Sequence, residues 1–132
     1  MDEFFTFKAV PNEVGCEHGV TFKGMVGESV DFLDTTVTLQ VDGRLTTTMY
    51  VKPTDANRYL NRHSDHSPHS FYSIPFSQFG QAVVLCSDEN DKIRCMDYIS
   101  EKLISRGYKP NEIQSAREKV MKLERNDILS VD

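Results

Sequence analysis

The strongest constraint on the fold is a β-hairpin signal over residues 30–52, VDFLDTTVTLQVDGRLTTTMYVK. Threonine and apolar residues dominate both sides of Asp42-Gly43, a dipeptide that is typical of hairpin turns. A three-residue loop that ends at Gly43 pairs Leu39 with Leu45 and puts both apolar faces on one side of the ribbon. A two-residue loop would set those faces against each other. We therefore predict the three-residue loop, with Gly43 in the left-handed region.

The hairpin needs support from elsewhere in the chain, because a two-stranded ribbon is marginal in water. In the predicted register, Leu33 belongs to the first strand and faces Val51 of the second. Pro53 ends the second strand, since proline cannot donate to a ladder. Residues 54–73 then form an irregular loop with one short turn near 56–60. A loop of this length in a compact domain is uncommon and often functional.

Three amphipathic helical patterns follow the loop. The first is expected to begin near Ser73 or Pro75, where a proline in the first turn loses nothing. The second covers about 91–106, with Asn90 available as its cap, and the third covers about 110–125. The expected core positions are Phe76, Phe79, Val83, Cys86, Ile93, Met96, Ile99, Leu103, Ile113, Ala116, Val120 and Leu123.

These patterns predict an α+β fold. An antiparallel hairpin at about 30–52 packs beside a three-helix bundle at about 74–126, with 1–29 as an irregular N-terminal segment and 30–132 as the hairpin plus helical domain. With 132 residues, the chain is long enough for one domain overall with a modest core.

Composition limits the setting of the protein. The longest apolar run, 82–86, is far too short to cross a bilayer, and the acidic N-terminus argues against an export signal. The three cysteines, Cys16, Cys86 and Cys95, include no CxxC pair. They fit a reducing compartment and buried free thiols, so we expect a nuclear or cytoplasmic location and no membrane partner.

Charge is distributed unevenly along the chain. The net charge is −5, yet residues 92–125 hold nine Lys or Arg and five acids, whereas residues 1–43 hold two Lys and eight acids. A nucleic-acid partner would meet the basic segment, because phosphate attraction depends on local basic surface. The alternative, a merely solvated helical surface, stays open at this point.

Few residues suggest metal or covalent chemistry. His63, His66 and His69 recur at a spacing of three, but the Ser/Pro-rich loop around them favours hydrogen-bonding histidines over a zinc site. Asp31 and Asp34 point to opposite faces of a strand, which argues against one shared ion. The chain contains no GxSxG, HExxH or phosphate-binding glycine loop. We expect no catalytic residue, metal ligand or cofactor in this chain.

Several sequence pieces occur in an order that resembles retroelement reverse transcriptases of the Penelope-like and related target-primed type. The resemblance covers about residues 20–126. The pieces are FLD followed by TTVTL, LTTTMYVKPTDANRYL, SDHSPH, SIPFSQFGQAVVLCS and the RGY step at 106–108. The resemblance implies a hairpin from the palm–thumb junction and a helical thumb that holds a template–primer duplex. A divalent metal would belong only to the complete enzyme, because no paired aspartates occur here.

The resemblance implies weak backbone contacts with an RNA–DNA or DNA duplex, made as part of a larger polymerase and catalytically silent alone. Where that family often carries arginines, this chain has Gly80 and Gln81. A small non-enzymatic protein-interaction module derived from such an element is the alternative. The predicted nucleic-acid contacts are Arg44, Lys52, Arg58, Arg62, Lys102, Lys119 and Lys122.

Overall fold

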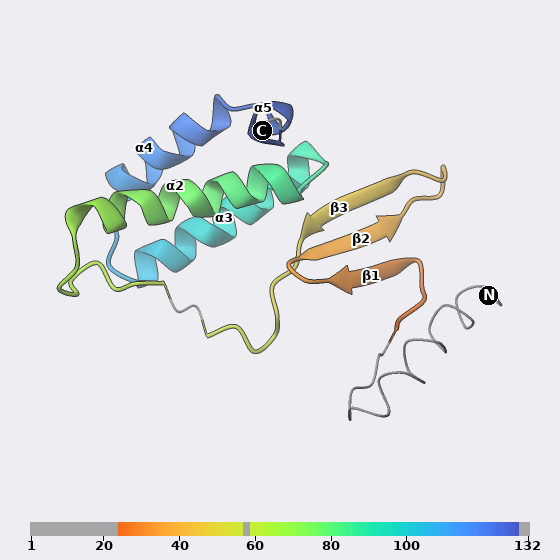
Figure 1. Ribbon diagram of the computed structural model, residues 1–132, viewed down its shortest axis with the longest axis horizontal. Coiled ribbons are helices and arrows are strands. Elements are labelled where there is room, and N and C mark those ends of the chain that lie inside the picture. Colours follow the sequence, from red (N-terminus) through yellow and green to blue (C-terminus); the bar gives the residue numbers. More distant parts are fainter. Residues whose placement is uncertain (1–23, 57–58, 130–132) are drawn as a thin grey trace, which may run out of the picture.

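The computed structural model describes residues 24–56 and 59–129. Within these ranges the protein is α+β, with a three-stranded antiparallel sheet beside a bundle of helices (Figure 1). The predicted fold class, a hairpin packed beside a helix bundle, is confirmed. The elements are β1 (Ser29–Phe32), β2 (Thr35–Leu39), β3 (Leu45–Met49), α2 (Pro68–Leu85), α3 (Glu89–Ser105), α4 (Pro110–Met121) and α5 (Arg125–Leu129). The division of the chain at residue 29 stays a prediction.

The β2–β3 hairpin has the predicted register. Leu39 pairs with Leu45, and the loop closes with the Gln40 N–H donating to the Arg44 carbonyl at 2.7 Å. Gly43 has a φ of 83°, a conformation that glycine adopts without the Cβ clash of other residues. The three-residue loop is therefore confirmed.

The start of the sheet differs from the prediction. Leu33 is not in a strand: it lies in the turn between β1 and β2 with a φ of 55°. The two-residue loop lets Phe32 pair with Thr35, which adds β1 to the sheet. On the other side, the Tyr50 N–H donates to the Asp34 carbonyl at 2.8 Å, after β3 has ended. The predicted pairing of Leu33 with Val51 is wrong because the chain reverses at Leu33.

Helix α2 begins earlier than predicted. Pro68, not Pro75, occupies its first turn, where a missing N–H costs nothing. Pro75 lies inside the helix, although it removes one backbone hydrogen bond there. Its ring is almost completely buried, so packing in the core compensates for the lost bond. The loop after the sheet is correspondingly shorter than the sequence suggested.

The core lies among α2, α3 and α4, with α2 between the other two in Figure 1. The prediction holds for most core positions, but Phe76, Ile93 and Leu123 are 43%, 40% and 38% exposed. In α2 the buried face starts at Phe71 and not at Phe76, because the helix begins one to two turns earlier than predicted. The side chains with no exposed surface include Phe79, Ala82, Met96, Ile99, Leu103 and Val120.

The helix ends are defined by local hydrogen bonds. Asp88, and not Asn90, caps α3: its carboxylate accepts from the backbone N–H groups of Asn90 and Asp91 at 2.9 and 3.3 Å. Gly107 stops α3 with a φ of 85°, as predicted. The short helix α5 was missed, and the Arg125 guanidinium secures its start by donating to the Val84 carbonyl at 2.9 Å.

The sheet joins the bundle at one corner, where β3 meets the turn between α2 and α3. The Ser87 N–H donates to the Thr47 carbonyl at 2.8 Å, and the Thr47 N–H donates to the Ser87 hydroxyl at 2.8 Å. Met49 is partly buried against the core. Beyond this corner the strands extend away from the helices (Figure 1).

Candidate nucleic-acid interface

Helices α3 and α4 are joined by a tight turn at residues 106–109. Gly107 lets the chain reverse, and the buried Tyr108 anchors the turn in the core at 3% exposure. The Tyr108 N–H donates to the Leu103 carbonyl at 3.1 Å, which closes the end of α3. Two helices joined by a short turn that contains glycine are found in αα-hairpins and in helix-turn-helix units.

The second helix of this pair, α4, has two distinct faces. Ile113, Ala116 and Val120 lie on the buried face. The opposite face is exposed and carries amide, hydroxyl and ammonium groups, which contact base edges and phosphates, together with one carboxylate, that of Glu118. This polar face of α4, with the lysine that follows the helix, consists of Asn111, Gln114, Ser115, Glu118, Lys119 and Lys122.

A groove of about 680 Å³ lies between α2 and α4 and runs beside the polar face. Two aromatic side chains of α2 line it with unusual exposure, Tyr72 at 62% and Phe76 at 43%. From α4 and the preceding turn come Lys109, Ser115 and Lys119. Aromatic faces and cations side by side can contact the sugar–phosphate backbone and unpaired bases.

The N-terminus of α4 is held in place by Arg62, from the loop before α2. Its guanidinium donates to the Glu112 carboxylate from Nη2 and Nε, at 3.0 and 3.3 Å, and lies 4.7 Å from the Phe71 ring centroid. The hydrogen bond from Arg62 lowers the pKa of Glu112, while the same bond raises the pKa of Arg62. This predicted phosphate ligand is therefore engaged within the protein.

The structure brings together only part of the predicted contact set. Lys119 and Lys122 lie at the end of α4, on the polar face. Lys102 belongs to α3, where its ammonium stacks 5.0 Å from the Tyr98 ring centroid. Arg44 lies in the β2–β3 turn, at the far end of the sheet from the helices (Figure 1), and pairs with Asp42 at 3.5 Å.

Lys52 follows β3 and lines a second cavity of about 450 Å³ between the sheet and the bundle. The cavity also contains the acidic residues Asp34 and Asp55, which do not favour a phosphate. Burial, aided by Asp55, raises the pKa of Tyr59 in this cavity to about 12, and the phenol donates to Gln78 at 3.0 Å. Arg58 lies outside the described residues.

The residues missed by the sequence analysis include Asn111, Gln114 and Ser115 of α4 and Tyr72 of α2. A signal for them was present: the three α4 residues occupy the helical positions opposite the core stripe. Assigning them required the knowledge that this face lies open beside a groove. Basic residues alone were therefore an incomplete guide to the surface.

No metal centre is formed by the residues that the structure describes: no three His, Cys, Asp or Glu side chains are grouped to hold an ion. His66 lies edge-on to the Phe71 ring, and its Nδ1 is 3.1 Å from the Ser64 hydroxyl. The His63 ring lies against Gly107, 3.1 Å from where a Cβ would be. Among the described helices, none has the length and hydropathy of a membrane span.

Residues 58–118 match the family model of the animal helix-turn-helix domain. The match covers residues 59–67 before α2, all of α2 and α3, and most of α4, so it contains the turn between α3 and α4 described above. No curated protein and no solved structure matches the chain.

This match corrects the relationship expected from the sequence. The model that fits is that of an animal helix-turn-helix domain and not of a reverse transcriptase family, so the predicted membership is wrong. The resemblance depended on short strings spread over β2, β3, α2 and the turns between elements. Such strings, including FLD and SDHSPH, are also what tight turns and helix starts require in unrelated folds.

Proposed function

We propose that the helical unit α2–α4 binds duplex DNA, with α4 as the helix that enters the major groove. The observation that carries this proposal is the polar face of α4, which directly follows the glycine-containing turn within the matched residues 58–118. In helix-turn-helix proteins, the second helix reads base edges with its N-terminal residues while the first crosses the backbone. A DNA partner is consistent with a nuclear location.

The side chains of α4 divide into two roles under this proposal. Asn111, Gln114 and Ser115 are near the N-terminus of the helix, where they would meet base edges. Lys119 and Lys122, further along, would meet phosphates. The Gln114 amide donates to Glu118 at 2.8 Å, so this bond must open before Gln114 can contact a base.

Two other charged side chains of α4 are already engaged. Arg117 donates to Asp97 of α3 at 2.6 Å, and Glu112 is bound by Arg62. These contacts hold α4 against its neighbours and leave its outer lysines to face a ligand. Few cations and a net charge of −5 predict weak binding with a shallow salt dependence.

The proposal is tested by fluorescence anisotropy of the full chain with a labelled DNA duplex over a series of salt concentrations. Replacing both lysines, Lys119→Glu with Lys122→Glu, should weaken binding by about tenfold or more at low salt and reduce the salt slope by about 2. The matched control is Arg44→Glu, a charge reversal in the distant β2–β3 turn, which should leave binding unchanged.

Equal losses in the control and in the double variant would contradict the assignment to α4. Absence of any binding at low salt would contradict the proposal as a whole. Running an RNA–DNA hybrid in parallel shows whether the duplex preference is for DNA. A contribution from Arg44 would restore the broader contact set that the sequence suggested.

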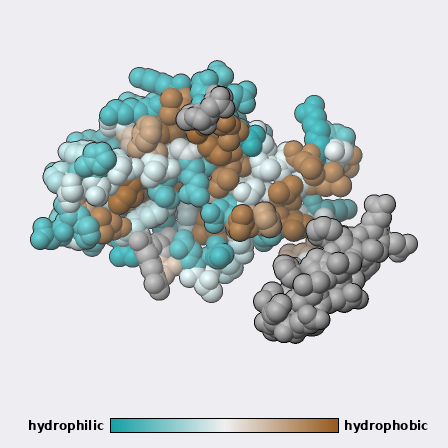
Figure 2. Space-filling model, viewed as in Figure 1, coloured by the Kyte–Doolittle hydropathy of each residue, from teal (hydrophilic) through white to brown (hydrophobic). Residues whose placement is uncertain are grey.

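A second candidate function, a protein-interaction module, is favoured by the apolar face of the sheet. Phe32, Leu39 and Leu45 are 68%, 49% and 66% exposed, and exposed apolar side chains that lie together are typical of interaction surfaces. Figure 2 shows hydrophobic residues gathered over the strands. Under this alternative the chain would fail to bind any duplex at low salt.

A further inference from the structure

Two free cysteines face each other at the corner where the sheet meets the bundle. Cys86 is the C-cap residue of α2 and Cys95 lies in the second turn of α3. The Cys86 thiol donates to the Cys95 sulfur, and the two Sγ atoms are 3.5 Å apart. The Thr48 hydroxyl of β3 lies 3.8 Å from each sulfur. The two thiols are therefore in direct contact.

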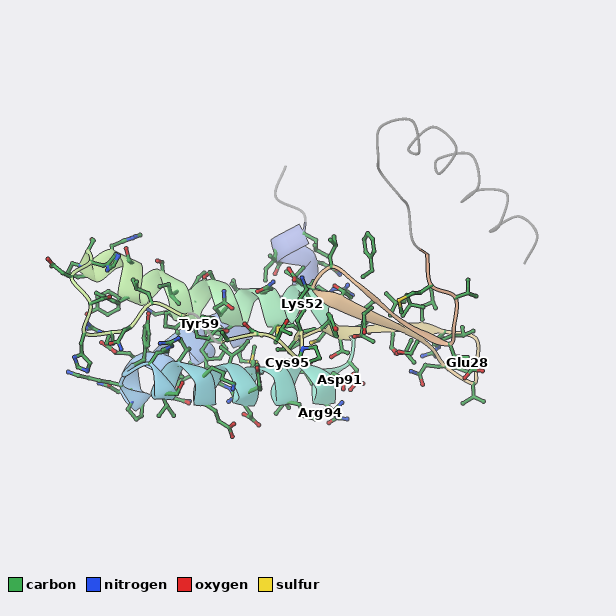
Figure 3. The ribbon with its side chains drawn as sticks, turned by 90° about the horizontal axis from the view of Figure 1, so that it is seen from below. Glu28, Lys52, Tyr59, Asp91, Arg94 and Cys95 are labelled. Atoms are coloured by element: carbon green, nitrogen blue, oxygen red, sulfur yellow. The ribbon has the colours of Figure 1, made fainter. Side chains whose placement is uncertain are left out.

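The two thiols differ in access to solvent. Cys86 is 1% exposed, so its thiol is shielded from solvent. Cys95 is partly exposed and lines a surface cavity of about 280 Å³. Figure 3 shows Cys95 near the beginning of α3, where that helix approaches the sheet. A small oxidant can reach Cys95 through this cavity, whereas Cys86 is covered.

The surroundings favour ionisation of the accessible thiol. The hydrogen bond from Cys86 lowers the pKa of Cys95, against the opposing effect of burial. The Thr48 hydroxyl and the positive charge of Arg94 act in the same direction as Cys86. The bond between the two sulfurs and burial raise the pKa of Cys86. The other charged or titratable groups that line the cavity are Asp91 and Tyr98, both from α3.

We infer that Cys86 and Cys95 form a peroxide-reactive dithiol, in which Cys95 is oxidised first and Cys86 resolves it into an internal disulfide. The inference is independent of the DNA-binding proposal, since it rests on the contact of the two sulfurs and on their unequal access. It assigns an oxidation site to two cysteines that the sequence predicted to be only buried free thiols.

The chemistry balances with hydrogen peroxide as the oxidant. The Cys95 thiolate attacks one peroxide oxygen, an S–O bond forms, the O–O bond breaks, and the leaving hydroxide takes up a proton to become water. The Cys86 sulfur, deprotonated as it attacks, then displaces hydroxide from the Cys95 sulfenic acid, so that an S–S bond forms and the S–O bond breaks. That hydroxide takes the Cys86 proton and leaves as a second water. The two sulfurs lose two electrons and the peroxide gains them.

The fold can accommodate the product. The sulfurs must close from 3.5 Å to about 2.05 Å, the length of a disulfide. Cys86 ends its helix with an extended backbone, φ −91° and ψ 123°, so its side chain can move without unwinding α2. The disulfide would tie the end of α2 to α3 directly beneath β3.

The inference is tested by mass spectrometry of the full chain after graded hydrogen peroxide. The expected product is a loss of two hydrogen masses, with a disulfide link between the peptides of Cys86 and Cys95 that a thiol reductant cleaves. In Cys86→Ser the Cys95 sulfenic acid should persist and be trapped by dimedone. In Cys95→Ser, reaction with peroxide at neutral pH should slow by about tenfold or more.

Two controls keep the outcome clear. Cys16, which lies outside the described residues, is replaced by serine in a parallel set so that no product involving it is counted. Far-UV circular dichroism verifies that each variant is folded, and the unmodified chain carries the main test without any variant. Dimedone on Cys86 in place of Cys95, an intermolecular product, or no disulfide while Cys95 overoxidises would overturn the inference. A rate midpoint at or above the usual thiol pKa of about 8.5 would overturn the role of Cys95.

Discussion

The helix bundle and the sheet differ in how far they bury their apolar side chains. The bundle closes around side chains with no exposed surface, such as Phe79, Met96 and Leu103, whereas no strand residue that the structure describes is fully buried. Apolar side chains far from the bundle pair across the ribbon, as Leu39 does with Leu45, and remain exposed to solvent. The comparison indicates that the bundle supplies most of the free energy of folding. The sheet is stabilised by its contact with the bundle at the corner where β3 meets the turn between α2 and α3.

The largest expected effect that tests this comparison is a cavity in the bundle. Phe79→Ala should lower the free energy of unfolding by about 3–5 kcal/mol, because a fully buried aromatic ring is removed from the centre of the core. The matched truncation in the sheet, Leu45→Ala, should change it by no more than about 0.5 kcal/mol. Urea denaturation followed by circular dichroism measures both. Similar losses in the two variants would show that the sheet shares the core after all.

Two glycines with positive φ give a sharper test of the same contrast. Gly107→Ala should cost about 1–2 kcal/mol in global stability, because the left-handed conformation penalises a Cβ. That Cβ would also lie 3.1 Å from the His63 ring. Gly43→Ala introduces the same strain in the β2–β3 turn, where nothing lies within 4 Å of the new Cβ.

For Gly43→Ala we expect faster hydrogen exchange of the β2 and β3 amides with little change in the free energy of global unfolding. Native-state hydrogen exchange with increasing urea separates the two kinds of opening. If Gly43→Ala and Gly107→Ala increase the hydrogen-exchange rates of the helix amides equally, the sheet and the bundle unfold as one unit and the contrast is lost.

The cap of α3 should have an intermediate effect. Asp88→Ala should lower stability by about 1 kcal/mol, because two backbone N–H groups at the start of α3 lose their acceptor. Glu101→Ala, the same kind of acid-to-alanine change on the exposed side of α3, is the control and should stay within about 0.5 kcal/mol. Thermal unfolding of both variants measures the difference. Equal decreases in Tm would contradict the role of Asp88 as the cap of α3.

The smallest expected effect is a pH dependence that comes from the bundle. Arg62 lowers the pKa of Glu112, so the contribution of this pair is complete above the unfolded-state pKa of about 4.3 and is lost as pH falls through the lower folded-state pKa. Glu112→Gln should therefore flatten the loss of stability in this acidic window. Urea midpoints measured across the window test this, and parallel curves for both proteins would contradict it.

Much of the fold followed from local patterns. Asp42-Gly43 and the alternation around it predicted the β2–β3 register, and Gly107 marked the end of α3, because these signals act over a few residues. The predicted start of α2 at Ser73 or Pro75 was wrong for a different reason. A proline inside a helix is normally unfavourable, and only burial of the Pro75 ring in the core makes it acceptable.

The candidate site was less accessible to sequence reasoning. Lys119 and Lys122 were identified from charge, and they lie together, but Arg62 has the same charge and serves an internal ion pair with Glu112. The charge of a side chain does not reveal whether the folded protein places an acidic side chain beside it. The exposed aromatics Tyr72 and Phe76 beside the groove were likewise invisible, since α2 reads as apolar along most of its length.

The sequence alone determined the order of elements from β2 to α4, the β2–β3 turn and most positions of the helical core faces, because each depends on backbone preference and on the spacing of apolar residues within one segment. Tertiary structure decided which of those faces became core and which stayed open. It also brought Cys86 within 3.5 Å of Cys95 and Arg62 within 3.0 Å of Glu112. Those distances result from helices packing against each other, and no spacing along the chain encodes them.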